Sequence, residues 1–227
     1  MSKLESSILM STFNNETTIR SSVKSILSQS YKNYELLIMD DDSSDLTGHY
    51  LANLSKEDSR IKIFKNVVNL GLTKSLNILI NHSHGSLIFR QDADDISLPN
   101  RLKKQVDVLK NSKYDICVTR AVTAGSLKRI PNKSYFLPYK LVMKYKNPFI
   151  HGTLGMKREV LINVGKYDED YYFSQDYHLY RKFIQSSYKI YKIRDIHYVL
   201  NTDNNISTNS KNEQKEYFNR SRKQKIV

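Results

Sequence analysis

The sequence predicts an α/β fold in which a mostly parallel, Rossmann-like sheet is flanked by helices. Over roughly the first 110 residues, short apolar runs alternate with segments whose apolar residues recur every three to four positions, as expected for strands and amphipathic helices. The chain holds only 7 glycines and 4 prolines in 227 residues, which suits an ordered globular protein. A strand–helix–strand order of this kind favours parallel strands with helices on both faces.

The short apolar runs and the helical spacing of apolar residues predict the elements of the first half in order along the chain. The expected strands cover residues 7–11, 35–39, 61–64 and 87–89, and the expected helices between them cover residues 19–27, 46–54 and 72–80. Ile19, Val23 and Ile26 carry the helical spacing of the first helix, and the turn 69–71 leads into the third.

The second half is less regular. Residues 120–147 form a basic, tyrosine-rich connection that contains Pro131 and Pro138, and long connections of this kind are often binding loops or lids. A strand-like segment at 153–156 follows, then a short helix near Lys157. Residues 173–176 open a further helix that carries apolar and aromatic side chains.

The composition indicates the cellular compartment in which the protein works. Cys117 is the single cysteine and lies in an apolar run, so we expect a buried, inert thiol and a reducing compartment. No run reaches the ~20 apolar residues that a membrane helix needs, and no signal peptide is visible. We therefore expect a cytoplasmic protein, or one held at the inner face of the cytoplasmic membrane.

Positive charge is unevenly distributed in a chain whose formal net charge is +13. Residues 116–158 contain no Asp or Glu, and the segment from Lys211 onward has six Lys or Arg against two Glu. Such patches attract phosphates on lipids, nucleic acids or small diphosphates. We expect the first patch beside an acceptor site and the second to attract an anionic membrane surface through Arg220, Arg222, Lys223 and Lys225.

Two acidic clusters follow predicted strands, at residues 40–45 and 92–95. The carboxyl ends of parallel strands share one edge of a sheet, so the clusters should converge there. Carboxylates this close repel one another unless a cation lies between them, and Mg²⁺ or Mn²⁺ would suit them. The alternative is a solvated acidic turn in which Asp95 caps a helix that begins near Pro99.

The order of several short motifs resembles the family 2 inverting glycosyltransferases, which have the GT-A fold. The resemblance extends from Ser7 to about Ser207. The matching segments are SILMSTFNNE from Ser7, SILSQSY from Ser25, DDDSSD from Asp40, NLG from Asn69 with SLN from Ser75, DADD from Asp92, NPFIH from Asn147, and Gln175-Asp176 with Leu179 and Arg181. Each segment alone is weak, whereas their order and spacing together are specific.

The resemblance implies a nucleotide-diphosphate sugar donor, with a UDP-sugar as the usual case, and Mn²⁺ or Mg²⁺ as cofactor. The acceptor would be a hydroxyl of a glycan or lipid-linked saccharide in bacterial surface polysaccharide synthesis, with no nucleic acid as partner. Residues 1–110 would bind the nucleotide sugar, residues 111–207 would hold the acceptor and the catalytic base, and residues 208–227 would form a basic tail.

Individual donor-site roles follow from the same resemblance. Ser11 and Phe13 match positions that line the nucleoside pocket. Asp41 matches the carboxylate that accepts a hydrogen bond from the base, and its alternative is an exposed turn residue. A desolvated uracil N3–H does need an acceptor.

The DxD motif corresponds to Asp92-Ala93-Asp94. Asp94 would be the direct metal ligand, Asp92 would lie close to the ribose and the metal, and Asp95 would stabilise the turn or helix that follows. Lys74 and Arg90 flank the acidic edge, where they would either contact the diphosphate or pair with Asp92.

Asp176 matches the general base that takes the proton of the acceptor hydroxyl, and its alternative is a helix N-cap. His151 lies before a glycine, which places it either at the acceptor site or in a structural role. One departure stands out: many relatives carry Tyr-Arg-x-His after the base helix, but this chain has Tyr198-Val199-Leu200-Asn201. Either a basic residue such as Lys211 substitutes for the missing Arg and His, or the loop is ordered differently.

Two other classes of function are compatible with parts of the sequence. A sugar-nucleotide nucleotidyltransferase also uses a nucleotide-binding sheet and metal-binding carboxylates, but it needs a glycine-rich phosphate loop, and residues 11–16 contain no glycine. A basic nucleic-acid-binding protein would suit the charge, but acidic clusters at the sheet edge would repel a phosphate backbone.

Overall fold

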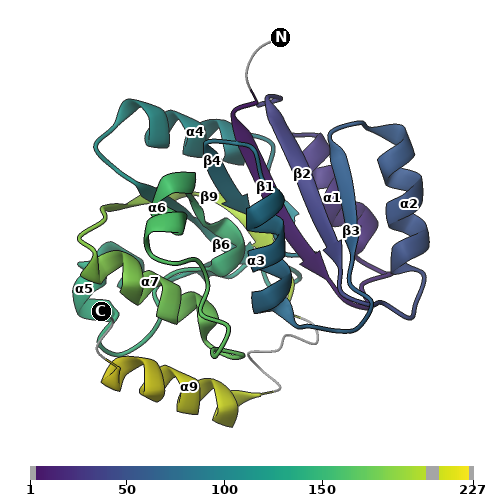
Figure 1. The fold of residues 1–227 in the computed structure, drawn as a ribbon. Helices are drawn as coiled ribbons and strands as arrows, with labels where there is room; N and C mark the ends of the chain where they lie inside the picture. The colour runs from purple at the N-terminus through teal and green to yellow at the C-terminus, as the bar shows by residue number, and fades with distance from the viewer. Residues whose placement is uncertain (1–3, 203–209, 225–227) are drawn as a thin grey trace.

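The computed structural model describes residues 4–202 and 210–224. Its first half has the predicted alternation of strands and helices (Figure 1). The elements are β1 (Ser6–Thr12), α1 (Ile19–Leu27), β2 (Tyr34–Asp40), α2 (Thr47–Glu57), β3 (Ile61–Lys65), α3 (Leu72–His82) and β4 (Leu87–Arg90). Strands β1 to β4 are mutually parallel in the order β3-β2-β1-β4, which confirms the predicted parallel sheet.

The second half extends the same sheet with mixed strands. It contains β5 (Ile96–Ser97), α4 (Arg101–Asn111), β6 (Ile116–Thr123), β7 (Arg129–Ile130), the 3₁₀ turns η1 (Lys133–Phe136) and η2 (His151–Thr153), α5 (Tyr139–Val142), β8 (Gly155–Lys157), α6 (Arg158–Asn163), α7 (Gln175–Gln185), β9 (Ile190–Leu200) and α9 (Lys211–Lys223). The order continues β4-β8-β6-β9-β5, with β8 antiparallel to both of its neighbours and β9 parallel to β6.

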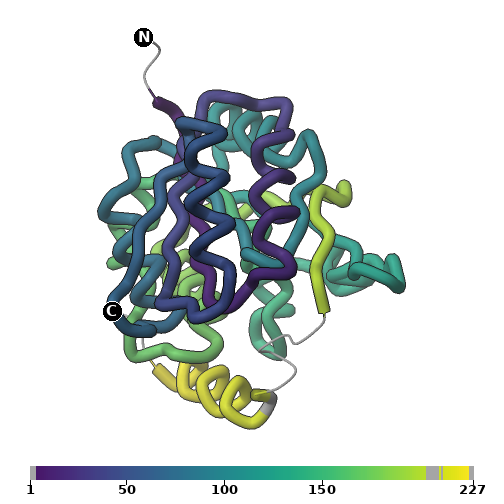
Figure 2. Tube along the Cα trace, turned by 90° about the vertical axis from the view of Figure 1, so that its right-hand side faces the viewer, coloured from purple at the N-terminus to yellow at the C-terminus, as the bar shows by residue number. Residues whose placement is uncertain are grey.

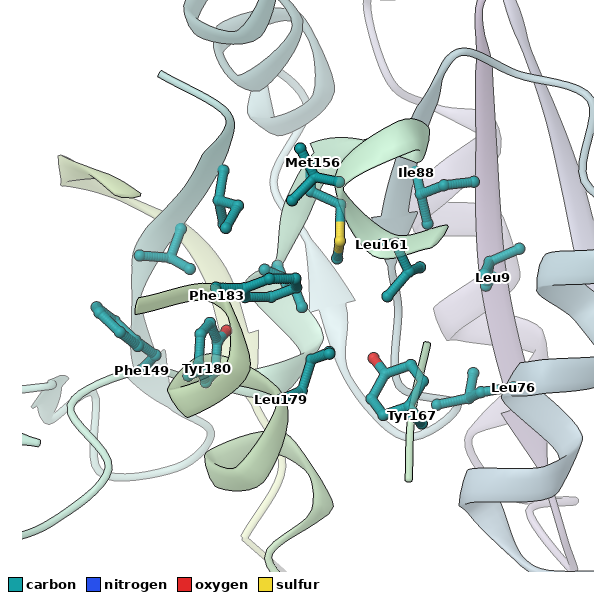
Figure 3. Close-up of a cluster of buried hydrophobic side chains, with 14 of the residues drawn as sticks. Leu9, Leu76, Ile88, Phe149, Met156, Leu161, Tyr167, Leu179, Tyr180 and Phe183 are labelled. Carbon is teal, nitrogen blue, oxygen red and sulfur yellow. The ribbon is translucent and has the colours of Figure 1, made fainter. Parts of the chain in front are cut away.

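Two apolar layers cover the sheet, one on each face. In β1, Ile8 and Met10 belong to the layer that also contains buried residues of α1, α2 and α4, whereas Leu9 belongs to the layer that contains buried residues of α3, α6 and α7 (Figure 3). This alternation places a helical layer on both faces of one sheet. Cys117 lies fully buried in the first layer, and burial raises the pKa of its thiol to about 12, as expected for an inert cysteine.

The structure refines two local expectations. The helix expected near Pro99 begins at Arg101 with Asn100 as its N-cap, so Asp95 does not cap it as the alternative interpretation supposed. Within the segment expected to be a basic tail, residues 211–223 form the helix α9, which lies under α7 in both views (Figures 1 and 2). Lys225 and the side chain of Lys211 lie outside the part of the chain that is described.

Helix α9 packs its few aromatic residues on the protein. Phe218 stacks on Tyr177 with ring centroids 4.2 Å apart, and Tyr217 meets the ring of Phe173 edge-on. The guanidinium of Arg220 lies 5.1 Å from the ring centroid of Tyr171. The aromatic side of α9 is therefore occupied by the protein itself.

Candidate active site

The carboxyl ends of β1, β2 and β4 form one edge of the sheet, as the sequence predicts. The backbone ladder continues past each strand: Asp41 donates its N–H to the Thr12 carbonyl at 2.9 Å, and Gln91 donates to the Leu9 carbonyl at 3.1 Å. The polar segments after these strands consequently start side by side, and this edge holds the predicted donor-site residues.

Asp41 has a role that the sequence did not reveal. Its buried carboxylate accepts hydrogen bonds from the Asn66 side chain at 2.6 Å, from the Leu70 N–H at 2.9 Å and from the Gly71 N–H at 2.8 Å. Asp41 therefore fixes the loop between β3 and α3, and it is not the exposed turn residue of the alternative interpretation. A carboxylate has about four acceptor positions, so one remains for a bound base.

The other predicted donor-site residues lie around this edge. Ser11 is partly buried near the end of β1, and Phe13 directly after the strand is 48% exposed. Lys74 is exposed in the first turn of α3. In the acidic cluster after β2, Asp45 accepts hydrogen bonds from Glu16 N–H and Thr47 N–H, so part of that cluster is structural.

Asp92 is held by a buried arginine. Arg90 is 1% exposed, and its guanidinium donates to Asp92 at 2.5 Å and to the Leu9 carbonyl at 2.7 Å. Of the two roles considered for Arg90, the structure shows the pairing with Asp92. The other oxygen of Asp92 lies over Gly152, where an added Cβ would be 2.6 Å from it, so the close approach requires glycine at that position.

The three carboxylates of the cluster have different surroundings. Asp95 is buried and accepts the Asn201 N–H at 2.7 Å, and burial together with the charges of Asp92 and Asp94 raises its pKa. Asp95 was expected to stabilise the turn or helix that follows; the structure shows that it ties the turn to the residue after β9 and does not cap α4. Burial and the charge of Asp92 raise the pKa of Asp94 to about 6.

Asp176 lies in the first turn of α7, as its second residue, so it is not the N-cap of the alternative interpretation. Asn147 donates its side-chain N–H to one carboxylate oxygen at 2.7 Å, and the Tyr177 N–H donates to the other at 2.7 Å. Burial raises the pKa of Asp176 to about 6, and the charge of Asp92 adds to the shift. The structure therefore brings Asp176 into the electrostatic neighbourhood of the DxD cluster.

His151 is the first residue of η2 and precedes Gly152, over which Asp92 lies. Its Nε2 shares a 2.7 Å hydrogen bond with the Tyr167 hydroxyl, and burial beside Arg90 lowers its pKa well below the usual value. Its ring is therefore neutral near pH 7. Its place at the acceptor side stays a prediction.

The residue before α7 is held in an unusual conformation. Ser174 has φ +52°, in the left-handed region that non-glycine residues seldom adopt. Gln214 of α9 holds it: the Ser174 N–H donates to the Gln214 side-chain carbonyl at 3.2 Å, and the Ser174 hydroxyl donates to the Gln214 backbone carbonyl at 2.9 Å. Helix α9 therefore helps to set the direction in which α7 starts, and with it the place of Asp176.

The cluster is chemically suited to a hard divalent cation that arrives with a diphosphate. Asp94 carries an oxygen donor whose charge no other side chain of residues 4–202 or 210–224 is seen to neutralise. Within the same residues, no three His, Cys, Asp or Glu side chains form a closed metal site. Mg²⁺ and Mn²⁺ are commonly held by one or two carboxylates plus substrate phosphates, so the donor set fits that mode of binding.

The sequence matches a family model described as glycosyl transferase family 2 over residues 7–184. The chain belongs to this family. It is 32% identical over 209 residues to the putative glycosyltransferase EpsE of Bacillus subtilis, which covers 87% of this chain and 73% of EpsE. It is 41% identical over 107 residues to WfgD of Escherichia coli, a UDP-Glc:α-D-GlcNAc-diphosphoundecaprenol β-1,3-glucosyltransferase, with 47% of this chain and 42% of WfgD covered.

Solved structures support the fold. A mannosyltransferase from Pyrobaculum calidifontis, in complex with GDP-Man and Mn²⁺, superposes with a TM-score of 0.77 at 19% identity and covers 98% of this chain and 66% of its own. S. aureus TarS 1–349 in complex with UDP-GlcNAc gives 0.76 at 17% identity, covering 91% and 61%. The chain has the GT-A fold, and as a family 2 member it is a glycosyltransferase with relatives in bacterial polysaccharide and O-antigen synthesis.

Several site residues were missed or undervalued by sequence reasoning. Asn147 belongs to the NPFIH motif, but no role was predicted for it; in the structure its side chain orients Asp176. Tyr198 is fully buried, and its hydroxyl accepts the Asp92 N–H at 3.1 Å. The stretch that departs from Tyr-Arg-x-His thus keeps the tyrosine as a support for the DxD turn, and its Asn201 backbone binds Asp95.

Proposed function

We propose that this protein is an inverting glycosyltransferase that moves a sugar from a nucleotide-diphosphate donor, with UDP as the expected nucleotide, to a hydroxyl of a lipid-linked saccharide. The observation that carries the proposal is the placement of Asp176. Its carboxylate is oriented by Asn147, has a pKa raised to about 6, and interacts electrostatically with Asp92 of the DxD turn. This interaction supports a general base close to the proposed diphosphate site.

In the proposed reaction, the acceptor oxygen forms a bond to C1 of the sugar while the bond from C1 to the diphosphate oxygen breaks. The acceptor proton passes to the Asp176 carboxylate, and the nucleoside diphosphate leaves. Attack from the face opposite the leaving group inverts C1, through a transition state with oxocarbenium character. A base with a pKa near 6 is deprotonated at neutral pH and is a stronger base than an ordinary aspartate.

On the donor side, we propose that Ser11, Phe13 and Asp41 hold the nucleoside. Lys74 would lie near the diphosphate. Asp94, with Asp92 behind it, would hold Mn²⁺ or Mg²⁺, which would neutralise charge on the departing diphosphate. Arg90 orients Asp92 and does not reach out to the donor, because it is buried.

The acceptor class rests on the named relative WfgD, which acts on a diphosphoundecaprenol-linked GlcNAc. Such an acceptor resides in a membrane, so we propose that the protein works at the cytoplasmic face of that membrane. No helix within residues 4–202 and 210–224 is both long and apolar enough to span one.

The test is a panel of UDP- and GDP-sugars offered with Mn²⁺ and a short-chain diphosphate-linked saccharide. We expect acceptor-dependent release of UDP and a product whose anomeric configuration, read by NMR, is opposite to that of the donor. Retention of configuration would overturn the inverting mechanism. Preference for GDP-sugars would overturn the choice of nucleotide but not the reaction.

A further inference from the structure

The segment from Lys133 to Lys146, called here the basic platform, has an unusual exposed surface. Leu137, Leu141 and Tyr145 are 51%, 48% and 75% exposed. They are spaced four residues apart. Helix α5 covers Tyr139–Val142, and hydrogen-bonded turns continue from it to Lys146, so Leu141 and Tyr145 lie about one turn apart on the exposed side of this segment. Exposed apolar side chains gathered in one short segment are characteristic of an interaction surface.

The inward side of the basic platform is firmly attached to the sheet. The buried Tyr135 hydroxyl donates toward the carbonyls of Val118 at 3.2 Å and Ile193 at 2.9 Å. Val142 and Met143 are also buried. The outward apolar residues are therefore held in place by a fixed support.

The charge around these apolar residues is positive. Lys133, Lys140, Lys144 and Lys146 are all exposed, and residues 116–158 contain no Asp or Glu. An anion alone would be bound by the lysines without any need for exposed leucine and tyrosine. Apolar side chains that enter the acyl boundary, flanked by lysines that reach the headgroups, match an anionic bilayer.

The basic platform is also joined directly to the site. The Met143 carbonyl accepts the Tyr177 hydroxyl at 2.7 Å, and Asn147, the residue after the platform, donates to Asp176. In Figure 1, α5 lies at the left of the molecule, next to α7. A membrane bound at the basic platform would therefore lie beside the helix that carries Asp176.

We propose that the basic platform is the membrane-contact surface of this protein, with Leu137, Leu141 and Tyr145 inserted among the headgroups of an anionic bilayer. The proposal deepens the proposed function, because it explains how a lipid-linked acceptor would reach Asp176. It also reassigns membrane attraction away from α9, where Arg220 and Arg222 lie over aromatic rings of the protein.

The chain has no tryptophan, which allows a direct test of insertion. Y145W places a single tryptophan on the platform, and Y191W is the matched control, on the surface at the start of β9. Vesicles of equal parts phosphatidylglycerol and phosphatidylcholine should shift the emission of Y145W to the blue at low salt and leave that of Y191W unchanged. An unshifted Y145W spectrum, or equal shifts in both variants, would overturn the proposal.

The charges are tested by sedimentation with the same vesicles. K140Q/K144Q should weaken binding about 30-fold, which corresponds to about 1 kcal/mol for each lysine near an anionic surface. K103Q/K104Q removes two exposed lysines from α4, on the opposite side in Figure 1, and should bind like the unmodified protein. Equal losses in the two double variants would show that net charge alone drives binding and would overturn the assignment of the surface.

Duplex DNA provides the last arm of the experiment. Vesicle binding that survives excess DNA supports the bilayer as partner, whereas DNA that displaces the vesicles and binds at lower concentration than they do would overturn it. None of these measurements needs a sugar donor. If the protein binds the vesicles through the basic platform but uses no sugar donor, the membrane-contact surface stands and the proposed function fails. If the protein transfers sugar but does not bind the vesicles, the proposed function stands and the membrane-contact surface fails.

Discussion

Replacing Asp94 with asparagine should stabilise the unliganded protein while it destroys metal-dependent nucleotide binding. The folded protein raises the pKa of Asp94 from 3.8 to about 6 through burial and the charge of Asp92. Each unit of pKa shift corresponds to 1.36 kcal/mol, so keeping Asp94 ionised in the folded state costs up to roughly 3 kcal/mol. An amide at this position has no such cost.

The sign of the pH dependence follows from linkage. Because the folded pKa is raised, the folded state binds the Asp94 proton more tightly than the unfolded chain does, so this contribution to stability is present below about pH 4 and is lost as the pH rises through about 6. The difference between D94N and the unmodified protein should be near zero at pH 4 and should approach its full value at pH 8. Urea unfolding at the two pH values measures it.

D92N is the matched control, because Asp92 has a cationic partner whereas Asp94 has an anionic neighbour. Asp92 is paired with the buried Arg90, and removing one partner of a buried pair typically costs about 3 kcal/mol or more. We therefore expect D92N to be less stable than the unmodified protein at pH 8 and D94N to be more stable. Calorimetry with UDP and Mn²⁺ should show weakened binding for D94N. A D94N protein that gains no stability at pH 8, or that keeps its Mn²⁺-dependent UDP affinity, would refute the reasoning.

Three further predictions concern the rest of the site. D176N should lower transfer at least ~10²-fold with UDP affinity retained, and the rate of the unmodified enzyme should rise with pH through about 6; a flat profile would point to another base. G152A should destabilise the fold in thermal unfolding, because the new Cβ would lie 2.2 Å from the Tyr198 hydroxyl and 2.6 Å from Asp92. Q214A removes the side-chain acceptor for the Ser174 N–H, so it should lower kcat and leave calorimetric UDP affinity unchanged; unaltered turnover would show that α9 does not position the base.

Much of the first half could be predicted because its structure is local. Strands β1, β2 and β4 are short apolar runs that end in polar turns, and their order along the chain determines their parallel pairing. The convergence of residues 40–45 with residues 92–95 follows from the same rule. The rule could not predict which carboxylates of the clusters have structural roles. Asp41 and Asp45 accept hydrogen bonds from neighbouring loops, and these contacts are visible only in the structure.

The second half depends on contacts that sequence periodicity does not encode. Strand β9 pairs with β6 across more than seventy residues, with register shifts between Val118 and Ala121, and this pairing carries Tyr198 and Asn201 to the DxD turn. Helix α9 is highly polar and shows only two aromatic residues, so it looks like a solvated tail until its docking on Tyr177 is seen. Such non-local contacts become visible only in three dimensions.

The DxD turn contains three carboxylates with different surroundings. Arg90 forms an ion pair with Asp92, and the backbone N–H of Asn201 donates to Asp95, whose raised pKa also favours its neutral form. Asp94 is left as the carboxylate that gains most from an incoming cation, because attraction to a positive charge would offset both causes of its raised pKa, burial and the charge of Asp92. Binding of Mn²⁺ with a nucleotide at pH 6 should therefore release a proton from Asp94 in addition to any proton that leaves the terminal phosphate of the nucleotide. Calorimetry of the unmodified protein and of D94N in buffers of different ionisation enthalpy would detect the difference. If the two proteins release the same number of protons, the cation is bound elsewhere, and Asp94 is not its ligand.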